Sequence, residues 1–197
     1  MSTAELTADP DWKLPSIRKM GMILLILTES ALFTIFVVAY IFYKGRSLNG
    51  PFPQTVLEFP WLASFALFGS SFTITVAEKM IHRGNRFGFH LWWGITMAMG
   101  AYFVYFTATE WYHLIYVDHL TISTNVFGTT FYSLVGLHVS HVLVGLLMLS
   151  IIFISSLRGK LKPDHYEHME ILSWYWHFVD AIWAVVVSVV YIYSVYF

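Results

Sequence analysis

The sequence has 197 residues, of which 57% are apolar and only 12% are charged, and its mean hydropathy is +0.64. One aqueous core cannot bury so many apolar side chains, so the composition indicates a polytopic membrane protein of the all-α class without a sizeable soluble domain. A net charge of −1 excludes a nucleic-acid partner, and the absence of cysteine excludes disulfides, thiolate nucleophiles and iron–sulfur clusters.

The first 19 residues are polar and charged, and they precede a long apolar run. No small-residue cleavage site follows that run, so a removable signal peptide is not indicated. We expect residues 1–19 to form an uncleaved cytoplasmic tail.

Five apolar runs follow the tail, each long enough to cross a bilayer as a helix. Most of them are separated by clusters of Gly, Pro, Asn and charged residues, which are typical of turns that end helices. We therefore expect residues 20–197 to form one domain of five transmembrane helices. The fourth run exceeds the thickness of the hydrocarbon layer, so its helix should tilt or protrude. The expected helices cover residues 20–43, 60–81, 88–115, 126–157 and 169–196.

The distribution of Lys and Arg indicates the orientation of these helices. Nine basic residues lie before the first run, between the second and third runs, or between the fourth and fifth runs. Only two, Lys44 and Arg46, lie on the other side. The side rich in Lys and Arg normally faces the cytoplasm, so we expect a cytoplasmic N-terminus and a C-terminus on the outside.

Glu29 is an ionisable residue in the middle of the first apolar run. A carboxylate at that depth is costly unless it is neutral, paired or in contact with water. Two interpretations remain open. Glu29 is either a functional acid, linked to proton transfer or to lipid, or a structural acid that is hydrogen-bonded to a neighbouring helix.

The fourth run carries His138 and His141, close to Gly136 and Gly145. The small residues suit close helix contact, so packing and hydrogen bonding are the favoured roles of these histidines. A haem site that also uses His177 of the fifth run stays open as an alternative, in a free-standing b-type cytochrome.

Two further acids lie in apolar surroundings. Asp180 lies three residues after His177, so the two side chains share one helical face and can pair. Glu110 lies near the outer end of the third run, where we expect an interfacial acid that reaches water.

Motifs of covalent chemistry are absent from the sequence, which has no phosphate-binding loop, nucleotide fingerprint, zinc-protease helix or nucleophile elbow. The sequence therefore offers no catalytic site on this chain, and we expect no metal ligands. A proton-coupled transporter that uses Glu29 and Asp180 is a further alternative, but the inverted repeats of such transporters are missing.

The fifth run resembles the signature of a known family, subunit III of the haem-copper terminal oxidases, which include cytochrome c and quinol oxidases. Glu170 is followed there by Tyr175-Trp176-His177-Phe178-Val179-Asp180 and by Trp183. The longer form of that family has seven helices, whereas this chain starts at what would be the third, so it resembles the short, five-helix bacterial form. Matching residues in the other runs are Glu29, Phe33, Pro60, Ser70, Thr73, Thr75, Gly100, Phe103, Glu110, Phe131, Gly136, His138, His141 and Gly145.

The resemblance implies an accessory subunit of a proton-pumping oxidase in a bacterial inner membrane. Such a subunit carries no haem or copper, because these cofactors belong to its partner subunits. It packs against subunit I in a complex with subunit II, binds phospholipid and supports proton uptake. Whether the complex joins a larger respiratory assembly stays open at this point. An accessory protein of a nitric oxide reductase is the alternative within the same fold.

The resemblance also implies roles for single residues. Glu29 occupies the position of the family's reactive acid. We expect Glu29 and His177 to line one polar pocket that faces lipid or subunit I, with Asp180 hydrogen-bonded to the histidine. His138, His141, Glu110 and Glu170 are further buried polar groups. Packing between helices or against subunit I is expected of Tyr175, Trp176, Phe178, Trp183, Gly136 and Gly145.

Overall fold

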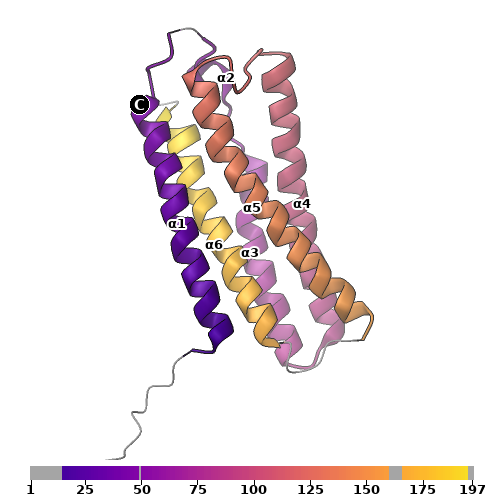
Figure 1. The fold of residues 1–197 in the computed structure, drawn as a ribbon. Helices are drawn as coiled ribbons and strands as arrows, with labels where there is room; N and C mark the ends of the chain where they lie inside the picture. Colours follow the sequence, from indigo (N-terminus) through magenta and orange to yellow (C-terminus); the bar gives the residue numbers. More distant parts are fainter. Residues whose placement is uncertain (1–14, 49, 160–165, 195–197) are drawn as a thin grey trace, which may run out of the picture.

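The computed structural model describes residues 15–48, 50–159 and 166–194, and the regular structure in these ranges is helical (Figure 1). Most of the expected tail, residues 1–14, lies outside the described residues. The last helix continues as a π-helical stretch, Ser188–Tyr193. The α-helices are α1 (Ile17–Tyr43), α2 (Pro53–Val56), α3 (Trp61–His82), α4 (Arg86–Tyr116), α5 (Val126–Leu157) and α6 (Tyr166–Val187).

The long helices of the described chain cover the five apolar runs, and their ends are marked by local signals. The Asn85 side chain accepts a hydrogen bond from the Gly88 N–H at the start of α4 (2.8 Å), and the Asn125 side chain caps α5 in the same way through Gly128 (2.8 Å). Gly84, with φ of +75°, follows the end of α3, where a residue with a Cβ would be strained. The short α2, within the first connection, was not predicted.

Consecutive long helices run in opposite directions, so the bundle has two distinct ends (Figure 1). The start of α1, the α3–α4 turn and the start of α6 lie at one end, and α2 lies at the other. α3 and α4 form the closest pair, whereas α6 packs against α1, α3 and α5. This central position of α6 brings its polar side chains against three different helices.

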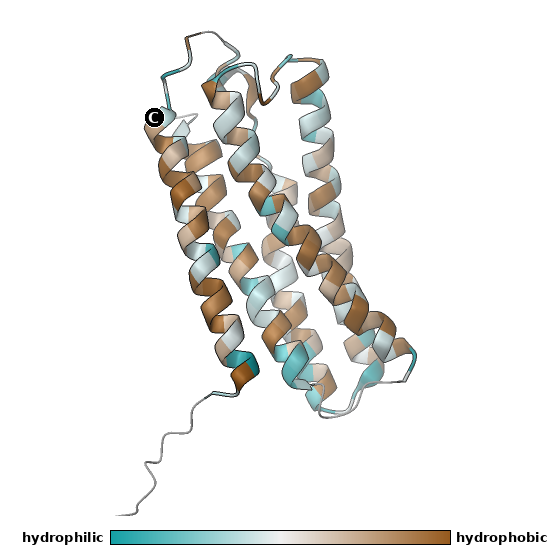
Figure 2. Ribbon diagram, in the orientation of Figure 1, coloured by the Kyte–Doolittle hydropathy of each residue, from teal (hydrophilic) through white to brown (hydrophobic). Residues whose placement is uncertain are grey.

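Apolar residues cover most of the helix surfaces, and polar residues gather toward the two ends of the bundle (Figure 2). Within the described residues, three helices are long and apolar enough to cross a membrane, namely Ile17–Tyr43, Val126–Leu157 and Tyr166–Tyr193. α3 and α4 carry more polar groups, and one pair of these meets in the 2.7 Å hydrogen bond between Thr73 and Thr96. The structure is therefore that of a helical, multi-pass membrane protein.

Trp176 of α6 occupies the centre of the bundle and is fully buried. Its ring lies between Gly100 of α4 and Gly145 of α5, where a Cβ added to either glycine would come within 2.8 Å of the indole. Its Nε1–H donates to the Ser70 hydroxyl of α3 (2.8 Å). One side chain thus determines how closely four helices approach one another.

Candidate functional site

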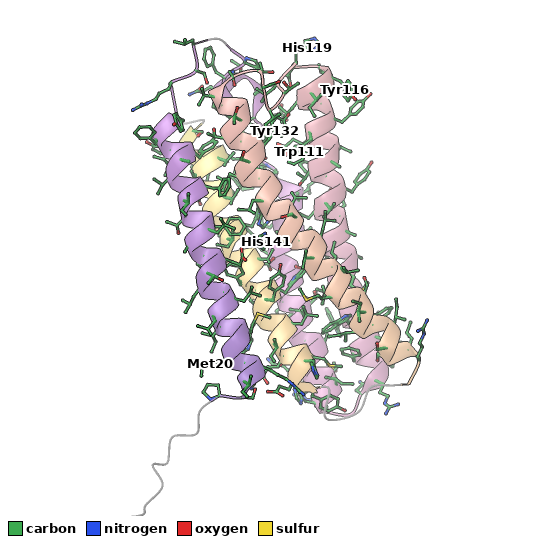
Figure 3. All side chains as sticks on the ribbon, in the orientation of Figure 1. Met20, Trp111, Tyr116, His119, Tyr132 and His141 are labelled. Carbon is green, nitrogen blue, oxygen red and sulfur yellow. The ribbon has the colours of Figure 1, made fainter. Side chains whose placement is uncertain are left out.

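Glu29 of α1 contacts His141 of α5, with 3.1 Å between Glu29 Oε2 and His141 Nε2. The two side chains are only 24% and 15% exposed. His141 lies about midway along the bundle, far from both Met20 at one end and His119 at the other (Figure 3). The acid is therefore paired with a neighbouring helix, which is how an ionisable group is accommodated at that depth.

The hydrogen bonds around His141 show how many protons the pair holds. His141 Nδ1 lies 2.8 Å from the Leu137 carbonyl oxygen, which can only accept, so Nδ1 carries a hydrogen. The contact between Nε2 and Glu29 Oε2 then needs one further proton, either on the carboxyl group or on the imidazole. In both states the pair is neutral as a whole and shares one transferable proton.

A cavity of about 210 Å³ adjoins this pair, between α1, α5 and α6. Its wall combines the apolar side chains of Leu25, Val144 and Met148 with four polar residues, although most of the surface that faces the cavity is apolar. One of the polar residues is Tyr175, whose hydroxyl donates to the His141 carbonyl oxygen (3.1 Å). An apolar cavity that holds one shared proton suits an acyl chain or another apolar group better than a polar solute. The lining residues are Leu25, Glu29, Ser140, His141, Val144, Met148 and Tyr175.

His177 lies elsewhere, against α3, so the expected common pocket of Glu29 and His177 is wrong. Its Nδ1 is 3.0 Å from the Ser71 hydroxyl, and its Nε2 is 3.4 Å from the Thr75 hydroxyl. His177 is two positions beyond Tyr175, about 200° around the helix, so the two side chains leave α6 in nearly opposite directions. The rotation of α6 about its axis therefore separates His177 from Glu29.

Asp180 does not bond directly to His177, contrary to the prediction from their spacing. The Ser71 hydroxyl stands between them, because it contacts His177 and donates to Asp180 Oδ2. Asp180 is only 4% exposed, and its Oδ1 has no hydrogen-bond partner among the described residues. The spacing of three residues places His177 and Asp180 on one face of α6, but the hydroxyl group of Ser71 from α3 lies between the two side chains.

His138 is fully buried in an aromatic environment. Its ring stacks on Trp183 at 5.0 Å between centroids and meets the edges of Phe33 and Phe103. Neither ring nitrogen has a partner within the described part of the chain. His138 and His141 both contact Phe33, whereas His177 is hydrogen-bonded to α3. His177 therefore does not face the other two histidines, as a haem held between α5 and α6 would require.

Glu110 of α4 is held by Tyr191, whose hydroxyl donates to both carboxylate oxygens at 3.0 Å. Tyr191 comes from the π-helical stretch at the end of α6, which the sequence analysis did not anticipate. Glu110 also lines a cavity of about 550 Å³, together with Glu58, His113 and Asp118. The acid therefore combines a buried partner with an adjacent cavity, where only contact with water was expected.

The acids at the start of α6 form ion pairs with α1. Glu170 accepts from Lys19 Nζ at 2.8 Å, and Glu167 lies 3.3 Å from Arg18 Nη1 and also accepts from the Ser16 hydroxyl. Glu170, expected as a buried polar group, is thus an interhelical ion-pair partner with a side chain that is 33% exposed.

The residues for which packing was expected have the following contacts within this chain. Trp183 donates from Nε1 to the Ser64 hydroxyl (3.1 Å), Phe178 meets the edge of Phe33, and a Cβ on Gly136 would touch Trp111 at 3.4 Å. Figure 3 shows Trp111 near Tyr132, between α4 and α5. Tyr175, Trp176 and Trp183 are all at most 3% exposed, so these side chains serve the bundle itself.

Hydroxyl groups of α3 pair with α6, a role that was not predicted, although Ser70 and Thr75 were among the residues that match the family. Ser64, Ser71 and Thr75 recur at intervals of seven and four residues, which places them on one face of the helix. That spacing was a usable signal for a polar contact, but it does not name the facing helix. In the described ranges, no group of three or more His, Cys, Asp or Glu side chains could hold a metal ion.

Comparison with known proteins identifies the family. Residues 14–195 match the family model of cytochrome c oxidase subunit III. The cytochrome c oxidase subunit 3 of Synechocystis sp. is 34% identical over 186 residues, which cover 90% of this chain and 76% of the relative. The subunit 3 proteins of Ovis aries and Pelea capreolus are 35% and 36% identical, over 86% of this chain and 68% of each relative. The chain therefore belongs to the cytochrome c oxidase subunit III family.

Proposed function

We propose that this chain is the accessory subunit III of a proton-pumping haem-copper terminal oxidase. The observation that carries the proposal is the family match, which extends over residues 14–195. The relatives compared above are named as subunits of cytochrome c oxidase, which favours this function over an accessory protein of a nitric oxide reductase. The haem and copper of such a complex belong to subunits I and II.

In this proposal the chain crosses a bacterial inner membrane five times. α3 and α4 have 22 and 31 residues, and about 20 residues suffice to span the hydrocarbon layer. The nine basic residues would lie at the cytoplasmic end, where α1 and α6 begin, and the C-terminus would lie outside. Residues 1–19 form a cytoplasmic tail, and residues 20–197 form the membrane domain.

The Glu29–His141 pair is the functional centre of the proposal. The pair holds one shared proton next to an apolar cavity of about 210 Å³. The same site could therefore bind both a proton and a lipid. A phospholipid acyl chain is the proposed occupant of that cavity. Through this site the subunit would support proton uptake and keep subunit I active during turnover.

A pull-down from native membranes tests the proposal. The chain carries an affinity tag, is extracted in mild detergent, and is analysed by reduced-minus-oxidised spectroscopy and mass spectrometry. We expect oxidase haem bands and a large multi-span subunit to co-purify, together with phospholipid. A chain that elutes alone, or with a nitric oxide reductase, contradicts the assignment.

A further inference from the structure

The seam between α3 and α6 contains a continuous line of polar groups that the pair at Glu29 does not use. Thr75 contacts His177 Nε2 (3.4 Å), His177 Nδ1 contacts the Ser71 hydroxyl (3.0 Å), and Ser71 donates to Asp180 Oδ2. The line starts at half-buried Thr75 and ends at Asp180, which is 4% exposed. It therefore connects the outside of the bundle with a buried carboxyl group.

Every group between Thr75 and Asp180 can both donate and accept a hydrogen bond, as hydroxyl groups and imidazole do. The neighbouring hydrogen bonds of the same seam differ in this respect. Trp176 and Trp183 donate to Ser70 and Ser64, and an indole N–H cannot accept. The indole contacts hold helices together, whereas the line through Ser71 and His177 can also pass a proton along.

The line ends at the Asp180 carboxyl group, whose surroundings favour the protonated form. Asp180 Oδ1 is buried without a partner among the residues described, and an unpartnered oxygen of a charged carboxylate is expensive inside a protein. With a proton on Oδ2, shared with Ser71, Oδ1 becomes a carbonyl oxygen, which is less costly to leave unpaired. The geometry thus favours an acid that holds a proton and exchanges it through Ser71.

We propose that Thr75, His177, Ser71 and Asp180 form a proton relay that loads and unloads a proton at Asp180 from the end of the bundle where α3 ends. The proposal rests on the proposed function, since a proton store at that end would serve proton uptake by the oxidase. It concerns a seam separate from the Glu29–His141 pair.

The proton transfer balances without a further reactant. During uptake the Ser71 proton moves to Asp180 Oδ2, and the Nδ1 proton of His177 moves to Ser71 Oγ. The Thr75 hydroxyl proton, which otherwise is donated to the Ser71 carbonyl oxygen (2.9 Å), moves to His177 Nε2, and a hydronium ion in solution returns a proton to Thr75. One proton has then moved from solution to Asp180, and His177 has changed tautomer. The reverse sequence releases the proton on the same side.

The charged groups around the relay favour proton entry from the end of the bundle where α3 ends. Glu78 of α3 is half-buried, lies about 10 Å from Ser71 along the helix axis, and acts electrostatically on His177. From α1 and α5, Glu29 and His141 face each other near Tyr175, on the opposite side of α6. Glu78 is thus the charged group placed to attract protons to the outer end of the relay.

Infrared spectroscopy of the purified oxidase complex tests the relay. The carboxyl C=O band of Asp180 is assigned by its loss in Asp180→Asn, and its shift is followed in time after transfer from H2O to D2O. We expect the exchange to be at least tenfold slower in Ser71→Ala and to recover in Ser71→Thr, which keeps the hydroxyl. Ser188→Ala is the control, because it removes an exposed hydroxyl from the π-helical stretch that follows α6 and should leave the rate unchanged.

Two results overturn the relay. One is an Asp180 band that exchanges in Ser71→Ala and in His177→Gln at the rate of the unaltered protein. The other is the absence of any carboxyl band of Asp180 across the pH range in which the complex is stable. If the tagged chain co-purifies with the oxidase but gives either result, the relay fails and the proposed function stands. If the chain purifies alone, the proposed function fails, and the exchange measured on the isolated chain still decides the relay.

Discussion

A substitution at Gly145 should destabilise the bundle, because the residue packs closely against Trp176. A Cβ on Gly145 would lie 2.8 and 2.9 Å from two atoms of the Trp176 ring, and 3.3 Å from Tyr175. Ordinary carbon contacts are about 3.5–4.0 Å, so the ring would have to move by more than half an ångström. The ring has little room to move, because it packs so closely on Gly100 that a Cβ built there would lie 2.8 Å from it, and because its Nε1–H is hydrogen-bonded to Ser70.

We therefore expect Gly145→Ala to lower the free energy of unfolding by roughly 1–2 kcal/mol. Overpacking of a core costs about 1–3 kcal/mol, and the gain in helix propensity from Gly to Ala returns at most about 1 kcal/mol. Gly136→Ala is the matched control on the same helix, because its Cβ would meet Trp111 at an ordinary 3.4 Å. That variant should be neutral or slightly stabilising.

The assay is unfolding of the purified chain, reconstituted in bicelles and titrated with a denaturing detergent, with helix content as the signal. Trp176→Phe provides a rescue, since the smaller ring leaves space for the Cβ of Gly145→Ala. The double variant should lose less stability than the sum of the two single variants. Equal stability of Gly145→Ala and Gly136→Ala, or the absence of rescue, would refute the argument that the indole is clamped between the two glycines.

Three further outcomes are expected. Ser70→Ala leaves the Trp176 Nε1–H buried without its acceptor and should cost about 1–3 kcal/mol in the same unfolding assay; a loss below about 0.5 kcal/mol contradicts this. Lys19→Ala removes the ion pair with Glu170, whose side chains are 27% and 33% exposed, and should cost less than about 1 kcal/mol; a larger loss would mean that the pair is effectively buried. Glu29→Gln keeps a hydrogen-bonding partner for the facing imidazole but removes the transferable proton, so the oxidase should assemble normally and lose activity sooner during turnover. Unchanged lifetimes would leave that acid with a structural role only.

Much of the fold could be predicted from local features of the sequence. Long apolar runs, with Gly and Asn at their ends, predicted the long helices to within a few residues, because helix ends depend on nearby capping groups and on glycine. The one-turn α2 and the π-helical stretch were missed. Their hydrogen bonding depends on the groups packed around them, as the bond from Tyr191 to Glu110 illustrates.

By itself, the sequence determined the class of protein, the apolar runs and the list of polar groups that need a partner in lipid. Only the tertiary structure decided which partners they have. Glu29 meets His141 and not His177, and Asp180 meets Ser71, because partner choice depends on how each helix is rotated and which helices adjoin. Those rotations are determined by long-range packing, in which Trp176 fits between glycines that lie far apart in the sequence.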